Sequence, residues 1–417
     1  MKNAKYIVLA AALSVAGCSG TSPSNVGMPA GAAGLSSGGS NGGQPAGAGT
    51  GGNVGRAGDT NHGGSSSGSG GSQADAGAAG AGVDGCGIED FSGITVFASG
   101  GWDPLGYPPY ALDGCTLVYV APSEPGATSG ALYRRDLVTG REVLLETAAL
   151  RPRRPAVAGD LVAWEVDVDG KSQVRVRYGN ETRDITGDFD HAGEPRVAPD
   201  AVVLTGFLGA TPEADSDVFV YDPVADKLVP VAVNKSQQRF ADISRDYVAL
   251  TDFTEDPQGY FNEMASVADV VLVDRATGNV TTRQREGKQA FPLLGSDGTL
   301  VYLDWGAVHP EPKFSQFSLR GGNVATAVTT DVDLKGEPVY TNPAYVRPSL
   351  RGKMVDFVDS RNGSIGLYHV TVGTGAPPLL TPIAGSPQLF GPVAGDSFTL
   401  VSQPLSGPTL ALTAVSR

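Results

Sequence analysis

Four side chains that could bind a metal ion lie within seven residues of one another. Asp188, Asp190 and Glu194 offer carboxylate oxygens, and His191 offers an imidazole nitrogen. Hard cations such as Ca²⁺ are held by oxygen ligands, so this cluster is a candidate calcium site. The alternative, a solvated acidic loop that binds no metal, is the interpretation we favour.

A second acidic run, from Glu165 to Gly170, begins like a calcium-binding loop. Its twelfth position is Val176, where such a loop requires a glutamate that binds with both oxygens. We therefore interpret this run as the polar tip of a hairpin, and we expect no resident cofactor.

Two further segments combine aromatic side chains with carboxylates. Exposed aromatic rings beside acidic groups suit contacts with carbohydrate or with peptide. The alternative is that the same rings pack their loops onto the domain. The candidate residues are Asp252, Glu255, Asp256, Tyr260 and Phe261 in segment 252–268, and Trp305, His309 and Glu311 in segment 305–316.

The chemistry that the sequence lacks narrows the choice of function. From residue 84 onward it contains no H-E-x-x-H, G-x-S-x-G, P-loop or Cys-x-x-Cys motif, so the common catalytic and nucleotide-binding signatures are missing from the predicted domain. The net charge of −14 disfavours contact with phosphate backbones, and we expect no nucleic acid partner. A Ser-His-Asp arrangement assembled from distant segments stays open, but nothing in the sequence requires one.

These candidates must be held by elements that recur along the chain. An apolar lead, a two-residue polar turn and an apolar strand appear seven times from residue 109 onward, and a strand, a tight turn and another strand follow the first six. Each unit therefore supplies four short antiparallel strands, which can cover both faces only by packing against neighbouring sheets in a ring. The polar turns begin at residues 113, 159, 199, 245, 297, 351 and 395.

The repeat predicts an all-β fold, a β-propeller of about seven four-stranded blades over residues 84–417. The apolar segment 93–100 could supply a closing strand to the last blade. Six or eight blades stay open, because the count depends on this closure. A pair of β-sandwiches is the alternative fold.

The repeat unit resembles that of TolB-like propellers. The likeness lies in the turn before an apolar strand, at 198–200 and 295–298, and in the D-x-x-T-G hairpin, at 136–140 and 274–278. It covers roughly residues 105–417 and implies the propeller fold. TolB proteins carry an α/β domain before the propeller, where this chain has a coil, so the resemblance is not extended to TolB's partners.

The phase of the repeat predicts which face of the propeller binds. In a blade of four sequential strands, turns 1–2 and 3–4 lie on one face, and loops 2–3 and 4–1 lie on the other. The tight turns fall on the first face, and the long, variable connections fall on the second, which we call the loop face. Length variation confined to one phase indicates a functional face. The connections expected there are 121–131, 165–173, 186–194, 208–216, 252–268, 305–316 and 329–343.

The first residues of the chain predict its compartment. Two lysines precede an apolar run over 6–15, which is the layout of an export signal and is too short to span a bilayer. The sequence Val15-Ala16-Gly17-Cys18 resembles the bacterial lipobox, in which the signal is cleaved before a cysteine that is then acylated. The resemblance implies a signal peptide over 1–17 and a lipid anchor on Cys18. A plain secretory signal with an incidental cysteine is the alternative.

The segment that follows has the composition of a disordered linker. Residues 19–83 contain 22 glycines and no Phe, Tyr or Trp. Such a segment cannot bury enough apolar surface to offset the entropy of ordering it, so we expect a flexible coil over 18–83.

Assigning Cys18 to a lipid leaves two cysteines. In an oxidising compartment Cys86 and Cys115 should form a disulfide that closes a loop of about 30 residues. It would tie the entry to the domain to the first repeat. Two free thiols are the alternative.

Taken together, these features predict a monomeric propeller displayed on the cell envelope through a lipid anchor, at the outer membrane or cell surface. The favoured function is non-enzymatic binding of an envelope protein or a glycan on the loop face. The alternative is a carbohydrate-active enzyme, a polysaccharide lyase or glycoside hydrolase, with its site on the same face.

Overall fold

The structure, a computed structural model, describes most of the chain from Cys86 to Arg417. The described residues are Cys86, Phe91, 93–98, 107–124, 127–208, 215–232, 237–255, 267–283, 286–304, 318–324, 329–331, 347–359, 366–374, 379–382, 391–406 and 409–417. The predicted signal peptide, Cys18 and the linker over 18–83 lie outside these residues. Within the described part of the chain, no helix has the length and apolar composition needed to cross a membrane.

The described residues form seven antiparallel sheets of four strands each. The first three blades contain β2 (Tyr110–Asp113), β3 (Thr116–Pro122), β4 (Gly130–Asp136) and β5 (Glu142–Glu146); β6 (Arg153–Ala158), β7 (Leu161–Val168), β8 (Lys171–Tyr178) and β9 (Glu181–Asp184); and β10 (His191–Ala198), β11 (Ala201–Leu208), β12 (Asp215–Asp222) and β13 (Lys227–Ala232). A short 3-10 helix, η2 (Ala148–Leu150), joins the first blade to the second.

The next three blades repeat the same pattern. They contain β14 (Gln238–Ile243), β15 (Tyr247–Asp252), β16 (Asp269–Asp274) and β17 (Val280–Arg283); β18 (Gln289–Leu294), β19 (Thr299–Asp304), β20 (Ser318–Asn323) and β21 (Thr329–Asp331); and β22 (Ser349–Arg351), β23 (Met354–Asp359), β24 (Gly366–Thr371) and β25 (Leu379–Pro382). The seventh sheet joins β26 (Val393–Ala394), β27 (Phe398–Ser406) and β28 (Thr409–Ser416) to β1 (Thr95–Phe97).

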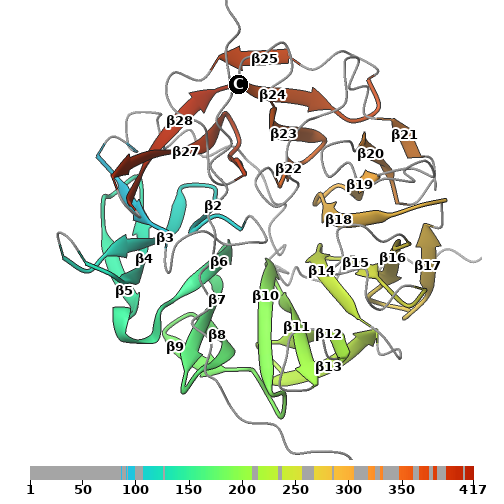
Figure 1. Ribbon diagram of the computed structural model, residues 1–417, viewed down its shortest axis with the longest axis horizontal. Helices are drawn as coiled ribbons and strands as arrows, with labels where there is room; N and C mark the ends of the chain where they lie inside the picture. The colour runs from blue at the N-terminus through green and yellow to red at the C-terminus, as the bar shows by residue number, and fades with distance from the viewer. Residues whose placement is uncertain are drawn as a thin grey trace, which may run out of the picture. The chain divides into compact units, whose positions relative to one another are not determined.

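The first strand of each blade lies next to the centre of a closed ring (Figure 1). Each of these inner strands contacts the inner strand of the next blade, and β26 of the last blade contacts β2 of the first. The fold is therefore a seven-bladed β-propeller, as the repeat predicts, and not a propeller of six or eight blades or a pair of sandwiches.

The strand that closes the ring comes from the beginning of the domain. Thr95, Val96 and Phe97 pair with Ala411, Leu410 and Thr409 of β28, respectively. This confirms the predicted closing strand within 93–100. Hydrogen bonds between the two ends of the domain therefore complete the last blade.

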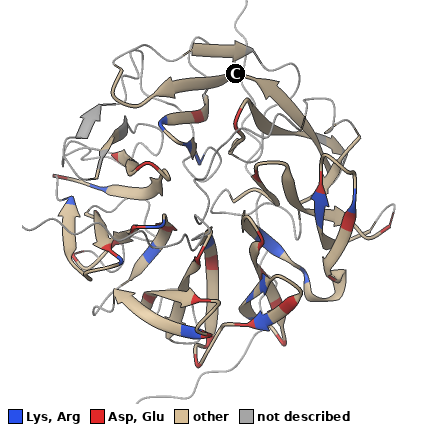
Figure 2. Ribbon diagram, turned by 180° about the vertical axis from the view of Figure 1, so that it is seen from behind, with Lys and Arg blue, Asp and Glu red and all other residues tan. Residues whose placement is uncertain are grey.

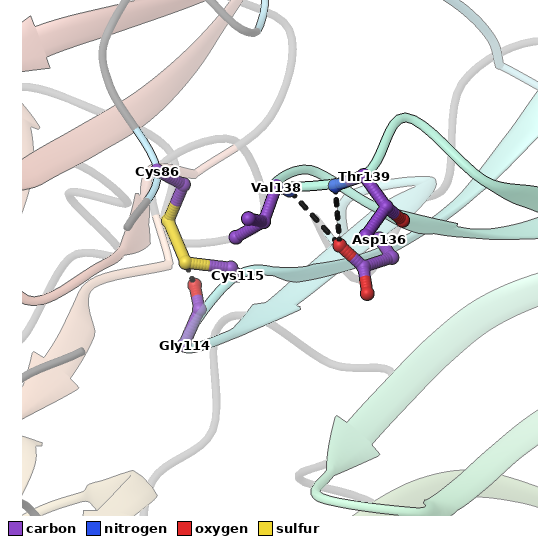
Figure 3. Close-up of a disulfide and its surroundings, with 6 residues drawn as sticks. All are labelled: Cys86, Gly114, Cys115, Asp136, Val138 and Thr139. Atoms are coloured by element: carbon purple, nitrogen blue, oxygen red, sulfur yellow. Dashed lines mark hydrogen bonds between the residues drawn. A yellow bond between two sulfur atoms is a disulfide. The ribbon is translucent and has the colours of Figure 1, made fainter. Parts of the chain in front are cut away.

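A disulfide holds the segment that leads into this closing strand (Figure 3). Cys86 bonds to Cys115, which lies in the turn between β2 and β3, with 5.6 Å between the two Cα atoms. The predicted bridge is therefore present, and it links the entry to the domain to the first blade. Beside it, the Asp136 carboxylate accepts hydrogen bonds from the backbone N–H groups of Val138 and Thr139 at 2.9 Å each. This Asx turn explains the aspartate of the D-x-x-T-G hairpin.

Apolar side chains pack between neighbouring blades. The second strand of a blade is covered on both faces; in β7, for example, every residue from Leu161 to Val166 is buried. Trp164 packs with Val118 and Val120 of the preceding blade and with Phe97 of the closing strand. These contacts make the inner strands a rigid frame for the residues that they carry.

The described connections follow the predicted division between the two faces, with one correction. β7 and β8 are joined by a two-residue turn at Asp169 and Gly170, both at positive φ, so the long connection expected at 165–173 is wrong. The run from Glu165 to Gly170 is the end of a strand followed by a hairpin tip, which agrees with its interpretation as the polar tip of a hairpin.

Candidate functional site

The inner strands of four consecutive blades share a bulge at the same position. In β10, pairing with β11 is interrupted at Glu194 and Pro195, and equivalent interruptions occur in β6, β14 and β18. The first residue of each bulge has a positive φ, which is uncommon for a residue with a Cβ atom. These residues are Arg154, Glu194, Phe240 and Phe291, with φ values of 49, 57, 55 and 57°.

Residues at and around these bulges contact one another across blades. Because the inter-blade connections lead into the inner strands, the first residues of those strands lie toward the loop face. Figure 2 shows charged residues on several of the strands around the centre. The central cluster, as we call this group, consists of Tyr107, Arg153, Arg154, Glu165, Glu194, Arg196, Arg239, Asp242 and Arg347.

Glu165 joins the second blade to the third. Its carboxylate accepts hydrogen bonds from Arg153 Nε at 2.9 Å and Arg154 Nη1 at 2.8 Å, and from the backbone N–H of Glu194 at 2.6 Å. The Glu165 side chain is 1% exposed, so it is a buried carboxylate whose charge two arginines neutralise.

Glu194 joins the third blade to the fourth in the same way. Its carboxylate accepts hydrogen bonds from both Nε and Nη2 of Arg239, from Thr205 Oγ1 at 3.1 Å and from the backbone N–H of Phe240 at 3.0 Å. Burial alone would raise the pKa of Glu194, but Arg239, Arg154 and these hydrogen bonds outweigh it and lower the pKa below its usual value. The carboxylate is therefore ionised at neutral pH.

Tyr107 lies at the centre of the cluster. Its ring contacts the guanidinium groups of Arg154, Arg196 and Arg347, with distances of 5.1, 4.7 and 4.2 Å from the ring centroid to Cζ. These arginines come from the second, third and sixth blades, so only a residue near the axis of the ring can contact all three. The hydroxyl group is buried and has no hydrogen-bond partner among the described residues, and burial raises its pKa, so it keeps its proton.

Arg347 is the most unusual member of the cluster. It is 3% exposed, yet none of its three guanidinium nitrogens has a hydrogen-bond partner among the described residues. It contacts the rings of Tyr107 and Phe291 instead, the latter at 5.6 Å. A buried guanidinium usually pairs with a carboxylate, because its five N–H groups are costly to leave without acceptors.

Arg196 is the second arginine of the central cluster without a carboxylate bonded to it among the described residues. It is partly exposed, and its Nε has no hydrogen-bond partner among the residues that the structure describes. Burial lowers its pKa, and the charge of Arg347 lowers it further.

Asp242 is an acidic group of the central cluster whose charge interacts with both of these arginines. Burial raises its pKa, although Arg196 and the N–H of Leu294, at 2.7 Å, act in the opposite direction. The central cluster therefore holds five arginines against three carboxylates. This makes it a positively charged site in an otherwise acidic protein.

The acidic cluster predicted at 188–194 is dispersed in the structure. Asp190 lies 3.6 Å from Lys171 Nζ, and His191 Nδ1 accepts a hydrogen bond from the N–H of Ser172. Asp188 is exposed in the connection between β9 and β10. Glu194 lies inside β10 and not in that connection, which corrects its predicted place. Among the described residues, no group of three or more His, Cys, Asp or Glu side chains is arranged to hold a metal ion.

The second group of candidates is described only in part. Asp252 ends β15 and accepts hydrogen bonds from Gln238 Nε2 at 3.0 Å and from the N–H of Thr254 at 3.0 Å. Glu255 follows in the same connection. The remaining candidates, Asp256, Tyr260, Phe261, Trp305, His309 and Glu311, lie outside the described residues.

Most of the central cluster was not anticipated from the sequence, although a signal for it exists. Arg154, Glu194, Phe291 and Arg347 each precede a proline in the same phase of the repeat. This residue stands immediately before, or at the start of, the apolar lead that defines each unit. This position is expected to face the buried centre of the ring. Charged residues there are therefore the signal in the sequence that could have identified the cluster.

A buried network between the last two blades contains His369. Asp356 is fully buried and accepts hydrogen bonds from Thr399 Oγ1 at 2.6 Å and from Arg417 Nη2, and its Oδ1 lies 2.8 Å from His369 Nδ1. Three partners hold the Asp356 carboxylate, so this network joins β23, β24, β27 and the last residue of the chain.

Comparisons with known proteins establish the fold. No protein-family model matches the sequence, and no curated protein matches it. The chain is similar to the β-propeller domain of the Trilobed protease from Pyrococcus furiosus, with a TM-score of 0.55 and 12% identity over 77% of this chain and 95% of that one. That propeller has an open velcro topology, whereas here β1 completes the last sheet.

Two further solved structures share the architecture. Acylaminoacyl peptidase from Pyrococcus horikoshii aligns with a TM-score of 0.51 and 11% identity over 76% of this chain and 53% of that one, so this chain spans about half of the peptidase. TolB from Acinetobacter baumannii aligns with a TM-score of 0.41 and 12% identity over 65% of this chain and 67% of that one. Likeness at such low identity concerns the fold and not the activity.

Proposed function

We propose that this protein is a binding propeller displayed on the cell envelope, and that it recognises an envelope protein or a glycan through the loop-face end of its centre. The observation that carries this proposal is the central cluster, in which arginines from the second, third and sixth blades contact the ring of Tyr107. Charged groups held on a rigid frame at the centre of a ring are typical of a recognition site.

The state of the carboxylates favours binding over catalysis. A general acid or base must exchange a proton with its substrate, and therefore needs a free oxygen and a suitable pKa. Glu165 accepts three hydrogen bonds and Glu194 accepts four, all from protein donors. Both groups position arginines, and neither is placed to transfer a proton.

The second candidate function is a carbohydrate-active enzyme, a lyase or a hydrolase. Asp242 supports it, because burial raises the pKa of this carboxyl group, which interacts with Arg196 and Arg347. An assay for release of reducing or unsaturated ends from acidic and neutral polysaccharides would separate the two functions. Turnover that is lost in Asp242→Asn would establish the enzyme, whereas binding without turnover would support the binding function.

Display on the envelope is supported by the lipobox-like sequence that ends at Cys18 and by the disulfide between Cys86 and Cys115. A structural disulfide is typical of an oxidising compartment outside the cytoplasm. A lipid on Cys18 would retain the chain at a membrane, and the outer membrane or cell surface is the proposed place.

Two experiments test this function. Metabolic labelling with a fatty acid should label the wild-type chain and not Cys18→Ala; a wild type without label would refute the anchor. Capture from an envelope extract should yield a partner that is lost when residues 256–265, which the sequence predicts to belong to the loop face, are deleted. The matched control is Arg275→Met, which removes an ion pair to Asp200 on the opposite face and should leave capture unchanged.

A further inference from the structure

Two guanidinium groups at the centre of the propeller, that of the buried Arg347 and that of the partly exposed Arg196, have no carboxylate bonded to them among the described residues. Arg196 and Arg347 both contact the ring of Tyr107, and the two ring-to-Cζ distances place their Cζ atoms within about 9 Å of each other. Like charges at this separation repel each other, and burial strengthens the repulsion. In the same cluster Arg153, Arg154 and Arg239 all have carboxylate partners.

This contrast distinguishes a site from a structural ion pair. The fold supplies Glu165 and Glu194 to neutralise three arginines, and it buries Arg347 beside them with all three guanidinium nitrogens lacking hydrogen-bond partners among the described residues. Within the described part of the chain, the Nε of Arg196 and the hydroxyl of Tyr107 also lack hydrogen-bond partners. Donors without partners among the described residues are therefore carried by three side chains from different parts of the ring, and two of these side chains contact the ring of the third.

We propose that Arg347, Arg196 and Tyr107 bind one oxyanion, a carboxylate or a phosphate group, of the ligand that enters from the loop face. The proposal rests on the proposed binding function and names the chemistry that the centre recognises. A guanidinium fork matches the two oxygens of either group, and the phenol adds a third donor. A bound anion would also remove the repulsion between the two arginines.

Asp242 sets the strength of this site. Its carboxylate is the acidic group that interacts with both Arg196 and Arg347. When ionised, the Asp242 carboxylate is attracted to the same two arginines as a bound anion and repels that anion, so it weakens anion binding. Asp242→Asn keeps an oxygen that can accept the hydrogen bond from the N–H of Leu294 and removes the competing charge.

Calorimetric titration of the purified full-length protein tests the proposal, with inorganic phosphate and D-glucuronate as probes and D-glucose as the neutral control. The buffer should have low salt and contain no phosphate or sulfate. We expect the wild type to bind at least one of the two anions and not glucose. Phosphate alone would identify a phosphorylated ligand, and glucuronate alone would identify a carboxylated one.

The variants separate this site from general attraction to positive charge. Arg347→Met should weaken binding about 10- to 100-fold, the loss that follows when a hydrogen bond to a charged group is removed. The affinity of Arg347→Lys for the anion should lie between those of the wild type and Arg347→Met. Asp242→Asn should bind the anion several-fold more tightly than the wild type. The control Arg275→Met, on the opposite face, should match the wild type.

Three results would overturn the proposal: no heat with either anion, equal binding of glucose, or unchanged affinity in Arg347→Met. These are distinguishable from failure of the binding function. A partner captured from envelope extract equally well by wild type and Arg347→Met would retain the function and refute the anion site. If Arg347→Met abolishes anion binding but the wild type captures no partner, the anion site would be retained and the binding function refuted.

Discussion

Replacing Arg347 with methionine should stabilise the unliganded protein, although it removes a buried contact. Methionine fills a similar volume and packs well against the rings of Tyr107 and Phe291. A buried polar group without a partner costs about 1–3 kcal/mol, and more when it is charged, while the lost cation–π contacts are worth up to about 2 kcal/mol. The free energy of unfolding should therefore rise by about 1–3 kcal/mol.

The same substitution at Arg239 is the matched control, and it should have the opposite effect. Arg239 pairs with Glu194, and the two side chains are 3% and 0% exposed. Arg239→Met leaves a buried carboxylate without its main counter-charge, which costs about 3–5 kcal/mol. Both variants lose one arginine from the same cluster, so their overall change in net charge is equal.

Differential scanning calorimetry at pH 7, without phosphate or sulfate, measures both effects. A domain of ~330 residues has an unfolding entropy of about 0.7 kcal/mol/K, so Arg347→Met should raise Tm by about 1–4 °C and Arg239→Met should lower it by about 4–7 °C. A fall in Tm for Arg347→Met comparable with that for Arg239→Met would refute the reasoning, because it would mean that Arg347 has an acceptor in the folded protein.

Three further predictions concern stability. The double variant Cys86→Ser with Cys115→Ser should lose roughly 3–4 kcal/mol, since the bridge closes a loop with a sequence separation of 29; an unchanged Tm under oxidising conditions would contradict this. Arg417→Met should lose about 3 kcal/mol in urea unfolding, because it removes the arginine partner of the fully buried Asp356; a loss below 0.5 kcal/mol would show that His369 and Thr399 suffice. The lowered pKa of Glu194 contributes stability that is present above its ordinary value of 4.5 and is lost as the pH falls below it. Tm should therefore fall less steeply between pH 4.5 and 3 in Glu194→Gln than in the wild type, and equal slopes would count against this assignment.

The propeller could be predicted from the sequence because its signal is repeated. Each blade must bury the same strands and turn at the same places, so the pattern of polar turns and apolar strands recurs along the chain. The closing strand near Val96 could be predicted because the last unit lacks a fourth strand. The disulfide could be predicted because one cysteine was assigned to the lipobox and two remained.

The central cluster could not be predicted because it is formed by residues far apart in the sequence. Tyr107 and Arg347 are 240 positions apart and meet only when the ring closes. The acidic residues near His191 suggested a metal site because they are close in sequence, but the strand direction and the bulge separate them. Glu194 turns into the ring and pairs with Arg239, while Asp190 pairs with Lys171 near the surface. Spacing along the chain indicates a site only when one element carries all of its residues.

The central claim is that the protein recognises its ligand through the arginines at the centre of the propeller. The most direct measurement is capture from envelope extract on immobilised full-length protein, followed by elution with inorganic phosphate or D-glucuronate. We predict that one of these anions releases the partner from the wild type, that D-glucose does not, and that Arg347→Met captures little of it. A partner that binds Arg347→Met as well as the wild type, and that neither anion releases, would contradict the claim.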